Sequence, residues 1–533
     1  MPRRSLTPAQ LQELHELAAQ WGKIIARRAC DDEDATLDLD LDFDAVEQIA
    51  QAAAAGLNEG TLEILLEQQA DARPDPSPCA GGDSIRANRF AMVPTAAGIF
   101  SPQRPLLRLD GHGYSPAVLQ QIVTAGARLH SFSDAAFALS LTGLSISARH
   151  VQQLTQEVGR ELAAARDEQA QQRRRRELKP QVAETPAVVA VEVDGGRLRT
   201  RAPNCGPGVH HAESKEDKIA CLVTLQSVEH AEDPCPEPPP SYLEPRRIQR
   251  LVKQMAGRAG DQPPAADEAA DSASPAAAEA VSPPATAKPE DEPWAPRRLM
   301  RTCVASLEAS RSFGPLMAGE AQARHFYGAS RRVRRCAAPV ADGQAYNGTI
   351  QRGYFPDFVP IVDFLHVICY LFAAAHTEQS EAKRWPQYLA WLRACQQGRS
   401  AEVVAELEQR QMALGRPPPG EKLAANDARQ IVAEALSYLR NNAGRMDYPS
   451  YRRQGLPTTS SLVESLVGEF NARMKGREKF WNRPGGAEAI LQVRAALLSE
   501  DDRLARHFAG RSGSAYRRRR TAKSPQPQSQ TCS

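Results

Sequence analysis

The sequence has no long apolar segment: no uninterrupted run approaches the roughly 18 residues that a membrane-spanning helix needs. The first residues also lack the apolar centre of a signal peptide, so we expect a soluble, cytoplasmic protein with no membrane partner. The 10 cysteines are scattered and include no C-x-x-C pair, which argues against a structural zinc site. The sequence also contains no P-loop, no G-x-S-x-G elbow and no H-E-x-x-H motif. We therefore do not expect the chemistry that each of these motifs supports.

The chain also has no large excess of positive or negative charge, since 66 Lys and Arg against 64 Asp and Glu give a net charge of +2. The distribution is uneven, however. Acid gathers in residues 31–44, and base gathers in residues 173–176 and 517–520. Such runs are usually solvated faces, but the arginine clusters are also candidate phosphate contacts.

At 533 residues the chain is too long for one hydrophobic core and predicts several units. Composition and periodicity divide it into a helical N-terminal region (1–75), an irregular linker (76–105), a helical region with a helix-turn-helix pattern (106–180), an α/β domain (185–505) and a basic tail (506–533). The α/β domain carries two insertions, one rich in proline and alanine (229–295) and one all-helical (372–455). The first has so little apolar surface that we expect it to be largely disordered and dispensable.

The helix-turn-helix pattern lies in residues 131–162. A short helix ends near Leu141, Thr142 and Gly143 form a turn, and Ser145 or Ser147 caps a longer helix. An ordinary αα-hairpin has similar spacing and stays an alternative. The predicted DNA contacts are polar side chains on the second helix and the basic cluster after it: Arg149, Gln152, Gln153, Gln156, Arg173, Arg174, Arg175 and Arg176.

Strand patterns begin near residue 186. Runs rich in β-branched residues predict three strands, which start near Ala187, Asp217 and Arg297. A helix, a strand ending in "PVADG", a short helix and a strand containing "PIVDF" follow. This order is typical of an α/β fold in which antiparallel strands continue into parallel ones.

Two aspartates follow apolar strand patterns in this domain. Asp194 ends the run "VVAVEV", and the two glycines after it are also a strong signal for a hairpin turn. Asp342 ends a second run and is followed by a helix, so a hairpin does not explain it. A carboxylate at the carboxyl end of a parallel strand lies where α/β sheets usually bind ligands.

A third acid, Glu464, lies in a predicted helix. It shares its face with Gly468, Asn471 and Lys475, and a solvated helix acid is the plain alternative. Three acids that converge can instead hold two divalent cations for phosphoryl transfer, and oxygen ligands suit Mg²⁺.

The order of these elements, with Asp, Asp and Glu on the first strand, the fourth strand and a late helix, resembles the RNase H-like catalytic domain of DDE transposases. The stretch "DFLH", Asp363–His366, is similar to the C/D-x-x-H signature of the Mutator-like group. Residues 451–482 and 486–498 are similar to C-terminal blocks of bacterial insertion-sequence transposases in that group. The resemblance covers about residues 106–498.

The resemblance implies an RNase H-like mixed sheet with an all-helical insertion. It implies Mg²⁺, with Mn²⁺ as a substitute, bound by the catalytic residues Asp194, Asp342 and Glu464. Asp363 and His366 become an accessory pair, although Asp363 also ends an apolar strand and rivals Asp342 for the second acid. Relatives usually carry paired cysteines in the region equivalent to residues 76–105, where this chain has only Cys79, which implies a degenerate zinc ribbon.

A basic and aromatic run, "NARMKGREKFWN", follows Glu464. We expect its cations to contact phosphates and the rings of Phe480 and Trp481 to stack on a base. The alternative is that both rings belong to the core. The predicted phosphate contacts are Arg473, Lys475, Arg477 and Lys479.

These patterns together predict a DNA transposase that cuts at the ends of its element and joins the freed 3′-hydroxyl to target DNA. We expect it to act as a homo-oligomer on DNA, associated with the nucleoid. Two alternatives stay open: a catalytically decayed, transposase-derived DNA-binding protein, and an RNase H-like nuclease that cuts without joining.

Overall fold

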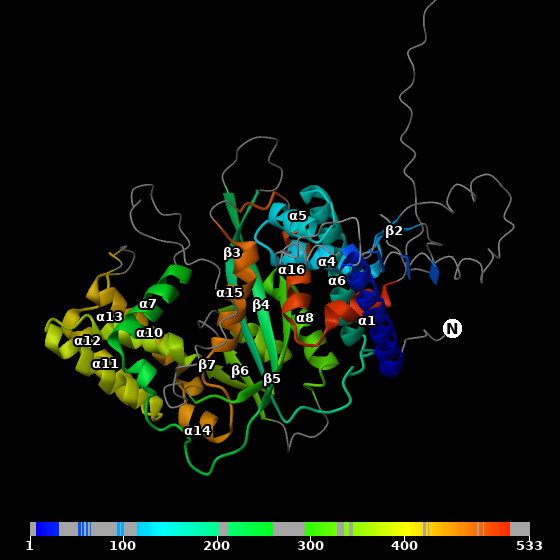
Figure 1. Cartoon of the computed structure of the whole chain (residues 1–533). Helices are drawn as coiled ribbons and strands as arrows, with labels where there is room; N and C mark the ends of the chain where they lie inside the picture. The colour runs from blue at the N-terminus through cyan, green and yellow to red at the C-terminus, as the bar shows by residue number, and fades with distance from the viewer. Residues whose placement is uncertain are drawn as a thin grey trace, which may run out of the picture. The chain divides into compact units, whose positions relative to one another are not determined.

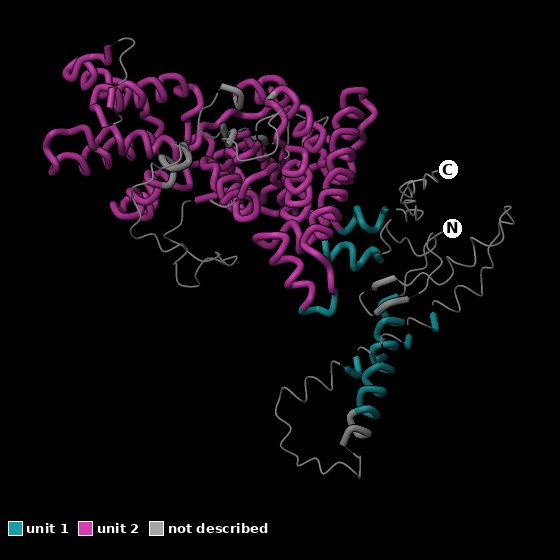
Figure 2. Tube along the Cα trace, turned by 90° about the horizontal axis from the view of Figure 1, so that it is seen from above, with its two compact units in different colours: residues 1–122, 141–144, 505–533 teal, residues 123–140, 145–504 magenta. Residues whose placement is uncertain are grey.

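The computed structural model of the chain describes residues 7–30, short pieces between 52 and 65, 93–95, 98–100, 114–201, 212–259, 294–327, 335–340, 345–418, 423–476 except 425, and 479–511 except 483. The chain divides into two compact units (Figure 2). Residues 1–122, 141–144 and 505–533 form the first unit, and residues 123–140 and 145–504 form the second.

The first unit contains helix α1 (Pro8–Cys30) and an antiparallel pair of short strands, β1 (Val93–Thr95) and β2 (Gly98–Phe100). The helix predicted from apolar periodicity near the N-terminus is thus present. None of the described helices in either unit combines the length and the apolar composition that crossing a membrane requires.

The second unit is built on one mixed sheet of five strands, in the order β5-β4-β3-β6-β7. Its strands are β3 (Val188–Arg201), β4 (Ala212–Gln226), β5 (Arg297–Ser306), β6 (Arg335–Val340) and β7 (Val359–Val362). β3, β4 and β5 are antiparallel neighbours, whereas β6 and β7 run parallel to β3. The predicted mixed α/β class is therefore confirmed.

The other described elements of the chain are helices and short 3-10 turns. Further helices are α4 (Pro116–Arg128), α5 (Phe132–Leu141), α6 (Ala148–Arg174), α7 (Pro245–Ala259), α8 (Ser310–Ala323), α9 (Ala345–Tyr354), α10 (Phe364–Ala375), α11 (Glu381–Gln396), α12 (Ser400–Leu414), α13 (Ala428–Asn442), α14 (Tyr448–Arg453), α15 (Ser461–Met474), α16 (Pro484–Leu498) and α17 (Arg503–Gly510), with 3-10 turns η1 (Pro240–Tyr242) and η3 (Ala443–Arg445).

Helices lie on both sides of the sheet, α8 on one side and α10 on the other (Figure 1), and side chains of β3 alternate between these two faces. Val189 and Val191 pack in one apolar cluster with Phe313 of α8. Val188 and Ala190 face the opposite side, where the cluster continues through α10 and α15 into the predicted all-helical segment, α11 to α14. The second face is the one that positions the acids described below.

The Asp-Gly-Gly stretch lies inside β3 and not at a turn, because β3 pairs with β4 along its whole length. The expectation that Asp194 ends its strand is therefore wrong. Close approach explains the glycines instead. A Cβ atom added at Gly195 would lie 2.6 Å from the backbone oxygen of Asp217, and one added at Gly196 would lie 2.1 Å from Lys475 Nζ.

The first part of the proline-rich segment is ordered. α7 buries Ile248 completely and packs Leu251 and Val252 against the same core, which is the i, i+3, i+4 pattern of an amphipathic helix. The expectation of a largely disordered, dispensable insertion does not hold for residues 229–259. Residues 260–293 lie outside the described part of the chain.

The helix pair α5 and α6 occurs where it was predicted. Gly143 between them has a φ of 82°, in the left-handed region that favours glycine. Ser147, and not Ser145, caps α6 by accepting a hydrogen bond from the N–H of His150 at 3.3 Å. This geometry is shared by αα-hairpins, so a DNA-binding helix-turn-helix stays a prediction.

Candidate functional site

Two acids of β3 face α10 and α15. Glu192 and Asp194 share this side of the strand with Val188 and Ala190, since side chains alternate along a strand. Glu192 is completely buried, whereas Asp194 is partly exposed. The sequence analysis did not single out Glu192, although an acid at an inward-facing position of an apolar strand is a usable signal.

Glu192 ties the start of α15 to β3. Its Oε2 accepts a hydrogen bond from the N–H of Val463 at 2.9 Å, and its Oε1 has no hydrogen-bond partner among the described residues. Burial raises the pKa of Glu192 to about 8; the Val463 N–H opposes this shift, and the carboxyls of Asp363 and Glu464 add to it. The contact places Glu464, the residue after Val463, near Glu192.

Asp363 caps α10 and also holds the segment before α15. Its Oδ1 accepts hydrogen bonds from the N–H of Leu365 at 3.1 Å and of Ser460 at 3.0 Å, and its Oδ2 lies 2.7 Å from Nδ1 of His366. Burial by itself would raise the pKa of Asp363. The hydrogen bond and charge of His366, together with the two N–H groups, outweigh burial and lower that pKa.

Glu464 lies in the first turn of α15 and completes the cluster. Its Oε1 accepts a hydrogen bond from the Ser460 hydroxyl at 2.9 Å, and its side chain is partly exposed. One ligand atom from each of Asp363, His366 and Glu464 lies within 4.8 Å of the others. The fold thus joins the predicted helix acid to the predicted accessory pair.

These donors suit a hard divalent cation only in part. Asp194 and Glu464 offer partly exposed carboxylates, the ligand type that Mg²⁺ prefers. Both oxygens of Asp363 are hydrogen-bonded and buried, and the imidazole of His366 suits softer metals, so this pair fits an accessory role better. Asp342 lies outside the described residues, so the choice of the second acid stays open.

A further acid that the sequence analysis missed, Asp217, lies on β4 directly opposite Gly196. Its side chain is completely buried, and neither carboxylate oxygen has a hydrogen-bond partner in the described part of the chain. Burial raises the pKa of Asp217, the charge of Lys475 opposes that shift, and Asp194 adds to it. Glycine at position 196 leaves the space that Lys475 occupies beside this carboxyl.

The basic run after α15 is partly structural. Arg473 is 3% exposed, its guanidinium lies 4.4 Å from the ring centre of Phe132, and its Nε donates to the Gly126 carbonyl at 3.1 Å. This burial leaves Arg473 no surface for the predicted phosphate contact. Trp481 is 9% exposed and its Nε1 donates to the Met474 carbonyl at 3.0 Å, so the core alternative holds for this ring.

The other side chains that were predicted to contact DNA differ in their exposure to solvent. Arg477 lies outside the described residues, and Lys479 donates to the Ala472 carbonyl at 3.0 Å. Arg149 and Gln153 of α6 are exposed, and Gln152 and Gln156 are partly buried. A DNA role for these side chains stays a prediction.

The arginine cluster at the end of α6 is also mixed. Arg173 lies 5.1 Å from the ring centre of Tyr327, and Arg175 pairs with Glu168 at 2.7 Å. Arg174 and Arg176 are exposed. Arg174 and Arg176 are therefore the more accessible cations of this cluster.

The chemistry of this site has to be inferred from its residues. Asp363 at the cap of α10, His366 and Glu464 of α15 converge, and Glu192 of β3 lies close enough to interact with both carboxyls. No known family model matches the chain, and no curated protein is similar enough in sequence to match it.

Proposed function

We propose that the protein is a DNA transposase of the DDE type with an RNase H-like catalytic domain. The observation that carries the proposal is the meeting of Glu464 with Asp363 and His366 beside β3, the strand that bears Asp194. The sheet supports the same fold, since three antiparallel strands are followed by two parallel ones. The predicted partners are the DNA at the element's ends, the target DNA and further copies of this chain.

Each acid has a proposed part. Two divalent cations, Mg²⁺ with Mn²⁺ as a substitute, would activate the attacking oxygen and neutralise the leaving oxygen. Asp194 and Glu464 would hold them together with Asp342. Asp363 orients the ring of His366, whose side chain is 19% exposed and can donate a hydrogen bond or a proton to DNA.

A strand-transfer assay with the DNA that flanks the coding region and Mg²⁺ tests the proposal. Asp194→Asn and Glu464→Gln should lose both cleavage and joining, because each removes a charged cation ligand. Glu381→Gln, which alters an exposed first-turn acid on α11, is the matched control and should keep both. Retention of both steps in either acid variant would refute the assignment, and cleavage without joining would identify a nuclease.

A further inference from the structure

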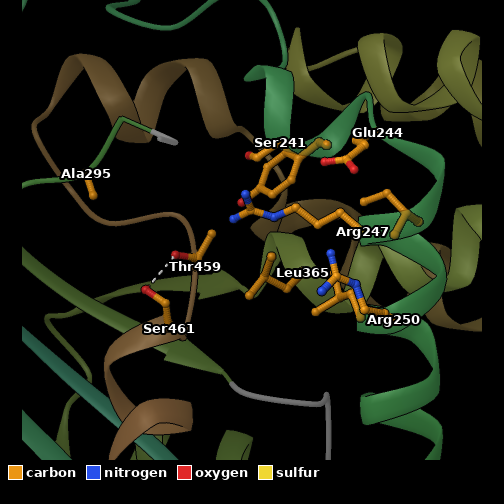
Figure 3. A pocket seen from close by; sticks show the side chains of 11 residues that line it. Ser241, Glu244, Arg247, Arg250, Ala295, Leu365, Thr459 and Ser461 are labelled. Atoms are coloured by element: carbon orange, nitrogen blue, oxygen red, sulfur yellow. Dashed lines mark hydrogen bonds between the residues drawn. The ribbon is translucent and has the colours of Figure 1, made fainter. Parts of the chain in front are cut away.

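The lining of a cavity of about 680 Å³, drawn in Figure 3, includes direct chain neighbours of the acid cluster. One wall comes from η1 and the first turns of α7, and the other comes from Leu365, Thr459 and Ser461. Leu365 lies between Asp363 and His366 in the chain, and Thr459 and Ser461 flank the residue that binds both Asp363 and Glu464. The cavity therefore borders the proposed reaction centre.

Two cations on α7 point into this cavity. Figure 3 shows Arg247 extending from α7 toward Thr459, and Arg250 lying closer to α7 beside Leu365. Neither side chain makes an ion pair or a hydrogen bond with any described residue. Glu244 is the one acid among the lining residues. The lining thus carries two solvent-exposed positive charges against one negative charge, a balance that suits an anion.

The lining also has donors and an apolar wall. The Ser241 hydroxyl is buried, and no described residue is its hydrogen-bond partner, while Thr459 and Ser461 bring two more hydroxyls. Ile248, Leu251 and Leu365 supply the apolar surface. Arginines and hydroxyls bind phosphate, and an apolar wall accepts a sugar or a base, so a nucleotide fits this lining.

We propose that the cavity binds the 5′-phosphorylated terminal nucleotide of a cleaved DNA strand, an inference that rests on the proposed function. When water attacks the scissile phosphorus, the bond to the 3′-oxygen breaks, that oxygen takes up the proton that water loses, and the phosphate stays on the 5′ end of the other fragment of the cut strand. A terminal phosphate carries about −1.5 to −2 charges, more than an internal diester, which matches two adjacent arginines. The cavity lies next to the place where this end would form.

Binding to the full-length chain tests the proposal. The probes are two single-stranded oligonucleotides of one sequence, one with a 5′-phosphate and one with a 5′-hydroxyl, and fluorescence anisotropy is measured in EDTA so that no cleavage occurs. We expect the phosphate to tighten binding about tenfold. Arg247→Gln with Arg250→Gln should abolish this preference, whereas Arg246→Gln, an exposed neighbour on α7 that does not line the cavity, should keep it.

An opposite change gives a second measurement. Glu244→Gln removes the carboxylate of the lining and should strengthen the preference for the 5′-phosphate, because repulsion is lost. A nucleoside 5′-monophosphate that competes as well as the oligonucleotide would identify a free nucleotide as the ligand and overturn the strand-end proposal. So would equal binding of both probes by the unaltered chain, or an unchanged preference in the double variant.

This binding experiment and the strand-transfer assay can fail independently of each other. If the preference holds and Mg²⁺ supports no cleavage, the proposed function fails and the cavity is still a site for a phosphorylated DNA end. If cleavage occurs and the preference is missing, the cavity proposal fails by itself.

Discussion

Asp363 makes the densest set of contacts at the site, because one carboxylate caps α10, fixes His366 and binds the N–H of Ser460. We expect Asp363→Ala to lower the free energy of unfolding by about 2–4 kcal/mol, measured by urea denaturation. Asp427→Ala is the control, since Asp427 also caps a helix, α13, and the contacts of its carboxylate stay within the first turn of that helix. The control should lose about 1 kcal/mol. Equal losses would contradict the wider role of Asp363.

The two glycines of β3 differ in what lies opposite them. A methyl group at Gly195 would meet the backbone oxygen of Asp217, which cannot move without shifting the ladder, whereas one at Gly196 would meet the flexible end of Lys475. We therefore expect Gly195→Ala to lower the free energy of unfolding by about 1–3 kcal/mol and Gly196→Ala by less. Thermal unfolding of the two variants gives the ranking, and the reverse order would show that backbone packing at Gly195 is not the constraint.

At the scale of elements, one ion pair fastens the proline-rich segment to the helical insertion. Arg452 of α14 donates from Nε and Nη2 to the two oxygens of Asp233 at 2.7 and 2.6 Å, and its side chain is 3% exposed. Burial opposes ionisation of Asp233, but the hydrogen bonds and charge of Arg452 outweigh it, so the pKa of Asp233 lies below its ordinary value. The pair therefore stabilises the fold above the ordinary carboxyl pKa, and this contribution is lost as the pH falls through the pKa of the folded state.

Asp233→Asn tests this ion pair. The variant leaves Arg452 buried without its carboxylate, so we expect it to lose about 3 kcal/mol at neutral pH. The difference from the unaltered chain should shrink as the pH falls below about 4, because Asp233 of the unfolded chain is protonated there first and Asp233 of the folded chain follows at its lower pKa. Glu232→Gln, at an exposed neighbour, is the control and should change little. If the free energies of unfolding of Asp233→Asn and the unaltered chain differed by a constant amount over this pH range, the ion pair would not be the cause of the lost stability.

At the scale of the whole molecule, α7 and the residues after it should contribute unequally to the free energy of unfolding. Residues 261–293 contain a single large aliphatic side chain, Val281, and no aromatic one, so they can bury little apolar surface. Replacing residues 262–292 with a shorter glycine–serine linker should leave the thermal unfolding of the protein unchanged. Ile248→Ala in α7 should instead cost about 2–5 kcal/mol, because it empties a fully buried position. A linker variant that unfolds as easily as Ile248→Ala would show that these residues do support the fold.

The same contrast shows how much the sequence could predict. The order of strands and helices along the chain was readable because the run of β-branched residues in β3 and the apolar helical pattern of α10 involve neighbouring residues only. The cap formed by Asp363 is also local, since it spans two residues. Glu464, Asp363 and His366 could be chosen from short motifs, and the fold brings these three together.

Other features could not be derived in this way. That Asp194 lies inside its strand depends on β4, which pairs across the glycines. The burial of Arg473 depends on Phe132 and Gly126, which are far away in the chain. The ordered start of the proline-rich segment depends on Arg452, which is 219 residues from Asp233. The local sequence pattern therefore determined which residues form helices and strands. The tertiary structure decided which charged side chains are buried, paired or exposed to solvent, because burial and pairing arise from contacts between segments that are distant in the sequence.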